Sequence, residues 1–460
     1  MNLTAPRPAN STSRPRLWAL AWPIILSNIT VPLLGLVDTA VMGHLPDSRY
    51  LAGVTLGATL FSFLYWGFGF LRMGTTGHVA RATGAGDSAE ALLVMLRASL
   101  LGLTIAIAVM VLGPAWIRFG LAIMQPDDLL VAPATSYIGI RLLSAPAVLV
   151  TYAIVGWFIG CQNTRWPMAL LLLTNGVNIG LDALFIMGLG LNSDGAAMAT
   201  VCADYCGLLL GIFAVRRTAT ALPSRRALRR GVIQVRAYRS LWQSNRNLMV
   251  RTVSLLACFA FFTAMGEKLG QDVLAANALM LQFLLLAAFA LDGFAYAVEG
   301  LGGSRLGARD LAGFYRVVAR CALWSGVSAC LISLLIALAQ PMLLPLLSDI
   351  QAVRQVLGEV HIWLVLMPLL AAPSYLLDGV FIGAAETRPL MTSMLFSALV
   401  VYLPAWYLLQ GWGNHGLWLA FALFNLSRGL SLAWVFWRFS IAGAWLSRTT
   451  GAGPAGVVTE

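Results

Sequence analysis

The stretch GWFIGCQNTR at residues 156–165 returns as GVFIGAAETR at residues 379–388, an offset of 223 positions. Six of the ten aligned positions are identical. Two shorter matches keep the same offset, because GAGD at 84–87 returns as GARD at 307–310 and Met42-Gly43 returns as Met265-Gly266. Three matches at one offset predict two halves built on one plan, with a shared site between them. An old duplication without a mechanistic role is the alternative.

The composition is that of an integral membrane protein. Hydrophobic residues make up 59% of the chain and charged residues 11%, whereas soluble domains carry roughly 25% charged residues. The apolar runs are continuous and do not alternate with polar residues, so the spans are helices and not barrel strands. Twelve spans are predicted, near residues 17–43, 51–80, 91–112, 129–160, 168–187, 196–215, 248–266, 274–301, 314–338, 355–383, 391–410 and 416–437.

The distribution of arginine predicts the topology. Residues 216–246 carry nine arginines, no acidic residue and no long apolar run. The positive-inside rule therefore places this segment and both termini in the cytoplasm. The predicted parts are an N-terminal tail at 1–16, an N-terminal lobe at 17–215, a basic linker at 216–247, a C-terminal lobe at 248–440 and a C-terminal tail at 441–460. Six spans in each half make the two lobes parallel and pseudo-symmetric.

The net charge of +11 comes mostly from this bias. Because the arginines flank spans and form no folded basic domain, we expect anionic membrane lipids as partners and no nucleic acid. The sequence has no Walker motif, no zinc-ligand spacing among its cysteines and histidines, and no catalytic constellation. We therefore predict neither an enzyme nor a cofactor.

Asp38 is the acidic residue with the strongest need for an explanation. It lies deep in the first span, where a carboxylate costs roughly 2.5–3.5 kcal/mol. Burial disfavours the charged form of a carboxyl group, so Asp38 is expected to bind a proton readily. Pro32 and Gly35 weaken the helix before it and make a hinge at which the span can bend.

A second polar group lies in the fifth and sixth spans. Spacings of three and four residues place its members on one face of each helix. The residues are Asn175, Asn178 and Asp182 in the fifth span, and Ala196, Thr200 and Asp204 in the sixth. Oxygen atoms of Asp38, Asn178, Asp182 and Thr200 could together hold Na⁺, and the same carboxyl groups could hold H⁺. A hydrogen-bond network that only joins helices is the alternative, and Asp204 could instead pair with an arginine.

The repeat separates the two halves chemically. At the offset of 223, Asp38 corresponds to Phe261 and Asp182 to Ala405, so coupling to a cation is expected in the N-terminal lobe. The C-terminal lobe has its own charges within spans. Glu299 and Asp378 are secondary candidates there, either as a second relay or as members of internal ion pairs.

Three segments resemble the multidrug and toxic compound extrusion (MATE) transporters, and in particular their DinF-type branch. They are NITVPLLGLVDTAVMGHL at 28–45, FLRMGTTG at 70–77 and GAAMAT at 195–200. The resemblance implies a V-shaped pair of six-helix lobes that work by alternating access. It also implies export of drugs or metabolites, often cationic or amphipathic, driven by inward H⁺ or Na⁺. Family motif positions fall on Asp38, Asn178, Asp182 and Thr200, with Ala196 offering a backbone carbonyl.

The sequence therefore predicts a monomeric, multi-pass exporter of small molecules in the bacterial inner membrane, coupled to H⁺ or Na⁺. The alternative function is a lipid or lipid-linked saccharide flippase, which would favour a strongly basic central cavity.

Overall fold

The computed structural model describes residues 17–28, 30, 48–124, 126–219, 225–347 and 349–447. Within these ranges the chain is helical and has no β-strand. After the helix Leu17–Asn28, the elements of the first half are α2 (Ser48–Gly67), α3 (Phe70–Gly84), α4 (Ser88–Met124), α5 (Asp128–Arg141), η1 (Leu142–Ser144), α6 (Ala145–Gly160), α7 (Arg165–Asp182), η2 (Ala183–Gly188) and α8 (Asn192–Thr218). Those of the second half are α9 (Arg225–Ile233), α10 (Val235–Lys268), α11 (Gln271–Gly307), α12 (Leu311–Leu347), α13 (Gln351–Gly383), α14 (Thr387–Phe396), η3 (Ser397–Tyr402), α15 (Leu403–Leu409), η4 (Gln410–Trp412), α16 (Gly413–Ile441) and α17 (Ala444–Ser447).

The helices are long and apolar enough to cross a membrane. Ten stretches of the described residues qualify by length and hydropathy. The last, Thr387–Ile441, is 55 residues long and provides two spans, because the chain reverses at Gly413, where φ is +57°. Leu17–Asn28 is a shorter apolar helix within the predicted first span. The described residues therefore form the predicted bundle of membrane helices.

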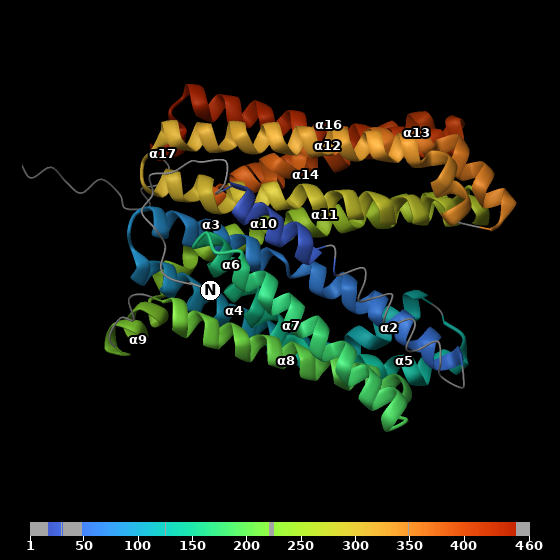
Figure 1. Ribbon diagram of the computed structural model, residues 1–460, viewed down its shortest axis with the longest axis horizontal. Helices are drawn as coiled ribbons and strands as arrows, with labels where there is room; N and C mark the ends of the chain where they lie inside the picture. Colours follow the sequence, from blue (N-terminus) through green and yellow to red (C-terminus); the bar gives the residue numbers. More distant parts are fainter. Residues whose placement is uncertain are drawn as a thin grey trace, which may run out of the picture.

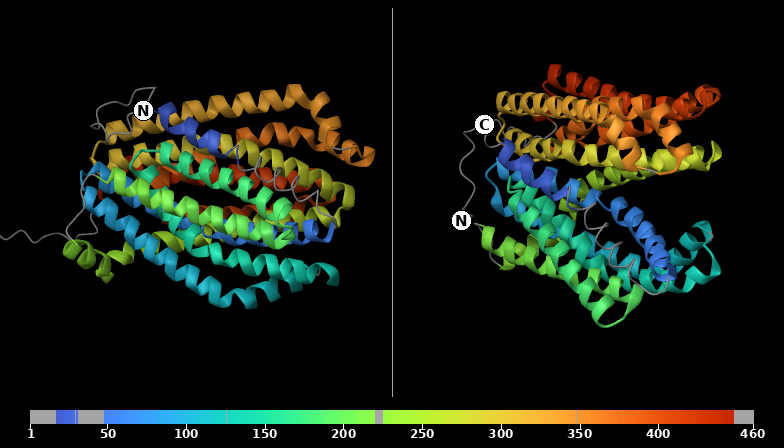
Figure 2. Two further views of the ribbon diagram at one scale, coloured as in Figure 1. Left: turned by 60° about the horizontal axis from the view of Figure 1, so that its bottom comes forward. Right: turned by 45° about the vertical axis from the view of Figure 1, so that its right-hand side comes forward.

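Two lobes form the molecule (Figure 1). Helices α2 to α8 make one lobe, and α10 to α16 make the other. The lobes meet at the end that carries α9 and diverge toward the opposite end, as the right-hand view of Figure 2 also shows. This is the predicted V-shaped arrangement.

Equivalent positions of the sequence repeat also share their backbone conformation. Gln162 and Ala385 occupy equivalent turns and have φ values of +59° and +55°. Gly86 and Arg309 are also equivalent and have φ values of +79° and +59°. Three of these four residues are not glycine, and such residues rarely adopt positive φ. The shared conformation is therefore a property of the common plan.

The first helix of each lobe reaches across to the other lobe. Trp18 packs edge-on against Phe294 of α11, with 5.4 Å between the ring centroids. In the equivalent region of α10, the Ser244 hydroxyl is 3.0 Å from Nε2 of His78 in α3. Helix α10 begins at Val235, before the lobe boundary expected at residue 248, and Ser244 lies in this earlier part of the helix.

The segment expected to be a linker is largely helical. It contains α9 and the first turns of α10. Arg97 of α4, which is 3% exposed, donates from Nε and Nη2 to the carbonyl of Gly231 at 3.1 and 3.0 Å. These bonds hold the end of α9 against the N-terminal lobe.

Candidate functional site

A cavity of about 780 Å³ lies between the lobes. Helices α2, α3 and α6 of the N-terminal lobe line it, together with α10, α11, α13 and α16 of the C-terminal lobe. The volume lies within the range of ligand pockets, roughly 300–1,000 Å³. Because both lobes contribute walls, any relative movement of the lobes changes the shape of the cavity.

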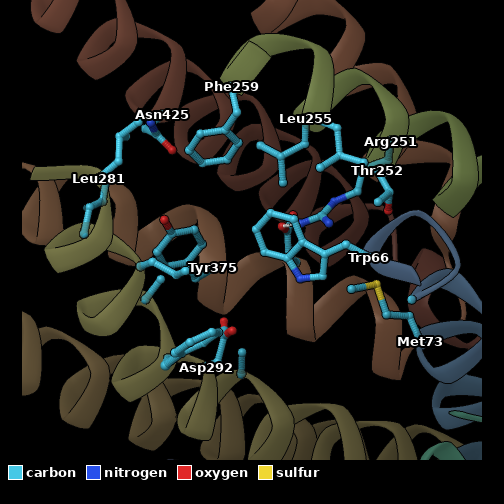
Figure 3. Close-up of a pocket in the computed structure, with 18 of the residues that line it drawn as sticks. Trp66, Met73, Arg251, Thr252, Leu255, Phe259, Leu281, Asp292, Tyr375 and Asn425 are labelled. Carbon is cyan, nitrogen blue, oxygen red and sulfur yellow. Dashed lines mark hydrogen bonds and ion pairs between the residues drawn. The ribbon is translucent and has the colours of Figure 1, made fainter. Parts of the chain in front are cut away.

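Aromatic rings form much of the cavity wall. Figure 3 shows Trp66, Phe259 and Tyr375 around the open space. Trp66 of α2 and Phe259 of α10 belong to different lobes, and their ring centroids are 6.4 Å apart. Large, flat side chains of this kind can pack against apolar ligands of various shapes and can attract cations to their faces.

An ion pair between the lobes lies in the cavity wall. The Nη1 atom of Arg72 in α3 is 3.0 Å from Oε2 of Glu299 in α11. The guanidinium of Arg72 also lies over the ring of Tyr296, 4.2 Å from its centroid. Glu299 is 1% exposed. This secondary candidate is therefore a member of an internal ion pair, one of the two roles that the sequence left open.

Asp378, the other secondary candidate in this lobe, accepts from two arginines. Its Oδ2 atom is 2.8 Å from Nη2 of Arg428 in α16 and also forms an ion pair with Arg251 in α10. Asn425 accepts a further bond from Arg428 at 3.3 Å. Two guanidinium groups beside the Asp378 carboxylate leave little attraction for a bound cation.

Asp292 differs from these acids. It lies on α11 and lines the cavity, and Figure 3 shows its carboxylate at the edge of the space below Tyr375 and Trp66. Within the described ranges, Asp292 forms no hydrogen bond or ion pair. The sequence signal for this residue was an acid within an apolar run, but Glu299 and Asp378 gave the same signal. Only the positions of the arginines separate the three acids.

The N-terminal lobe contains part of the predicted cation site. The Nδ2 atom of Asn178 in α7 donates to the Thr200 hydroxyl in α8 at 3.2 Å. That hydroxyl donates to the carbonyl of Ala196 at 2.9 Å. The structure thus brings Asn178, Thr200 and Ala196 together.

The other predicted members lie along the same face of α7. The Nδ2 atom of Asn175 is 3.5 Å from the hydroxyl oxygen of Thr30 in the first span. Asp182 is 3% exposed at the end of α7, directly before the π-helical segment η2. Segments of this type are frequent at functional sites. Asp38, Pro32 and Gly35 lie outside the described residues.

Asp204 belongs to a different interaction. Its Oδ2 atom is 3.0 Å from Nη1 of Arg141 in α5, and the same arginine nitrogen is 3.1 Å from the Ser144 hydroxyl. Asp204 therefore pairs with an arginine, which is one of the two roles that the sequence left open for it.

The oxygen atoms near Asn178 suit a small hard cation. The Oδ1 atom of Asn178 is buried and has no hydrogen-bond partner among the described residues. Amide, hydroxyl and carboxylate oxygens are the ligands that such cations prefer. The part of the chain that the structure describes holds no group of three His, Cys, Asp or Glu side chains arranged for a metal ion.

Comparison with known proteins agrees with this architecture of two lobes around a central cavity. The MatE family model matches residues 23–184 and 248–408, one match in each half. The chain is 40% identical to DNA damage-inducible protein F of Escherichia coli K12 over 443 residues, which is 95% of each chain. It is 26% identical to a probable multidrug resistance protein NorM of Geobacillus kaustophilus, over 95% of this chain and 97% of that protein.

A solved structure has the same fold. It is described as the outward-facing conformation of a multidrug resistance MATE family transporter of the MOP superfamily. The TM-score is 0.80 at 20% identity, with 93% of this chain and 96% of the other covered. The chain belongs to the MATE family, whose members are multi-pass membrane transporters and not enzymes.

Proposed function

We propose that the protein is a secondary active exporter that exchanges organic molecules for H⁺ or Na⁺ by alternating access. The observation that carries this proposal is the cavity between the lobes, which combines aromatic walls with the carboxylate of Asp292. This lining suits amphipathic cations, because the rings bind the apolar part and the carboxylate attracts the charge. Coupling is assigned to Asp38 with Asn178, Asp182, Thr200 and the carbonyl of Ala196.

The charge balance of the cavity supports an exporter over a flippase. Three arginines line it, but Arg72 is paired with Glu299, and Arg251 and Arg428 share Asp378. A site for a lipid pyrophosphate would need cations that are not already neutralised in this way.

The proposed orientation places α9 in the cytoplasm of a bacterium, with the protein in the inner membrane and both termini cytoplasmic. The arginines of the linker support this, by the positive-inside rule. The cavity extends from Glu267, at the far end of α10, to Glu299, beside the contact between the lobes. In this orientation the structure corresponds to an outward-open state.

Efflux from proteoliposomes tests the function. The purified protein is reconstituted, a cationic dye is loaded, and a pH gradient and a Na⁺ gradient are imposed separately. Dye movement driven by one gradient identifies the coupling ion. Lipid scrambling without gradient-driven dye movement would refute the exporter and favour the flippase.

A further inference from the structure

The lobes touch through glycines at the end that carries α9. Gly84 of α3 faces the carbonyl of Ser304 in α11, and Gly307 of α11 faces the carbonyl of Arg81 in α3. A Cβ atom at either glycine would overlap the facing oxygen. The two helices can approach this closely only because both residues lack a side chain.

A second pair of contacts repeats the pattern nearer the cavity. Gly77 of α3 faces the carbonyl of Ile382 in α13, and Gly300 of α11 faces the carbonyl of Ile159 in α6. A Cβ atom at Gly300 would lie 2.5 Å from the Ile159 oxygen. We call Gly77, Gly84, Gly300 and Gly307 the glycine seam.

The sequence repeat relates the glycines of the seam to one another, and it also relates the residues that they face. The offset of 223 positions relates Gly77 to Gly300 and Gly84 to Gly307. The same offset relates the facing residues, Ile159 to Ile382 and Arg81 to Ser304. Each lobe therefore presents the same surface to the other about a pseudo-two-fold axis, as in a symmetric dimer interface.

Polar contacts hold the glycine seam closed. The Arg72–Glu299 ion pair joins α3 to α11 between the seam and the cavity. The Nη1 atom of Arg81 donates across the interface to the carbonyl of Ala384 at 2.9 Å. At the four glycines themselves the contact is made with backbone carbonyl oxygens of the other lobe.

We infer that the glycine seam, together with the Arg72–Glu299 pair, is the gate that closes the cavity at the α9 end and must part when the cavity opens there. This rests on the proposed alternating access. At each of these four positions, an added side chain would collide with a backbone oxygen of the other lobe.

Distances between spin labels test the gate. Ala85 and Ala308 are equivalent exposed residues of the two turns beside the seam. The labels are attached at Ala85→Cys and Ala308→Cys after the six native cysteines are replaced. In Gly77→Ala and Gly300→Ala the distribution of label distances is expected to shift to longer values, because the added methyl groups hold the lobes apart.

Gly379→Ala is the matched control. Its Cβ would lie 2.5 Å from the carbonyl of Ala295, the same separation as at Gly300, but both residues belong to the C-terminal lobe. Gly326→Ala in α12 is a second control, since no atom lies within 4 Å of its added Cβ. Folded seam variants with the wild-type distance distribution, or an equal shift in Gly379→Ala, would overturn the inference.

A cross-link covers the case in which the seam variants do not fold. A short thiol cross-linker between the cysteines at 85 and 308 should abolish efflux, and cleavage of the linker should restore it. Undiminished efflux in the cross-linked protein would overturn the gate. The distance measurement needs no substrate or coupling ion, so a failure of the proposed transport function would leave its outcome unchanged.

Discussion

Arg72 and Glu299 lie in different lobes, yet the arginine Nη1 atom is 3.0 Å from the glutamate Oε2 atom. The repeat offers no such pair on the other side of the axis, because the positions equivalent to Arg72 and Glu299 are Ala295 and Thr76. This charged contact therefore occurs on one side of the pseudo-two-fold axis only. Because the ion pair lies in the cavity wall, the same two side chains can contact a substrate and join the two lobes.

Asp38→Asn is expected to abolish gradient-driven efflux while the protein still reaches the membrane. Asparagine keeps the shape of the side chain but can neither bind a proton nor supply the negative charge that holds Na⁺. The measurement is dye efflux from proteoliposomes under each gradient. Asp128→Asn is the control, because Asp128 is an exposed acid at the start of α5. Unchanged efflux in Asp38→Asn would remove Asp38 from the coupling mechanism.

Thr200→Val is expected to raise the ion concentration needed for half-maximal efflux. The Thr200 hydroxyl links the Asn178 amide to the Ala196 carbonyl, and valine leaves both without this partner. The measurement is efflux at a series of pH values and Na⁺ concentrations. Thr104→Val is a matched control, since Thr104 makes the same bond to the carbonyl four residues before it, also at 2.9 Å, on an exposed face. Equal ion dependence in both variants would contradict the prediction.

Asp292→Asn is expected to weaken binding of cationic dyes more than binding of neutral ones. Asp292 lines the cavity and forms no ion pair with an arginine in the described ranges. A loss of about 1.4 kcal/mol weakens binding tenfold, and we expect at least roughly this loss for a singly charged dye. Dye fluorescence titrations measure the effect. An equal change for a neutral dye of similar size would show that the charge of Asp292 does not select the ligand.

The sequence predicted the two halves and the helical spans, because each depends on local composition or on the repeat. For Asp204 the sequence left two roles open, a place in the cation site or a pair with an arginine, and only the structure identifies Arg141 as its partner. The cavity could not be predicted in the same way. Trp66 and Phe259 belong to different lobes, and the sequence alone does not distinguish them from aromatic residues that face lipid.

The roles of the glycines could not be predicted from the sequence either. The chain has 44 of them, and membrane helices carry glycine routinely. Gly300 and Gly326 look alike in sequence, but one faces a carbonyl of the other lobe and the other faces nothing within 4 Å. Their roles depend on how the helices are packed, which the local sequence does not contain.

Asp378→Asn is expected to destabilise the protein, by about 3–5 kcal/mol, the cost of breaking a buried ion pair. Asp378 is the shared partner of Arg251 and Arg428, and the side chain of Arg428 is 2% exposed. Without the carboxylate, two positive charges remain close together in a poorly solvated place. Thermal unfolding of the purified protein measures the change, and Asp378→Glu should restore part of the stability.

Asp310→Asn provides the contrast, because Asp310 pairs with Arg305 in an exposed turn. The Gly313 N–H donates to the Asp310 carboxylate, and this bond lowers the pKa of that carboxyl group. A carboxyl group with a lowered pKa in the folded state stabilises the protein above its unfolded pKa and loses this effect as the pH falls through the folded pKa. The difference in stability between wild type and Asp310→Asn should therefore be small at neutral pH and should vanish in acid.

For Asp378→Asn, one outcome would contradict the prediction. If this variant unfolded at the same temperature as the wild type but no longer transported, Asp378 would act in coupling and not in holding its arginines.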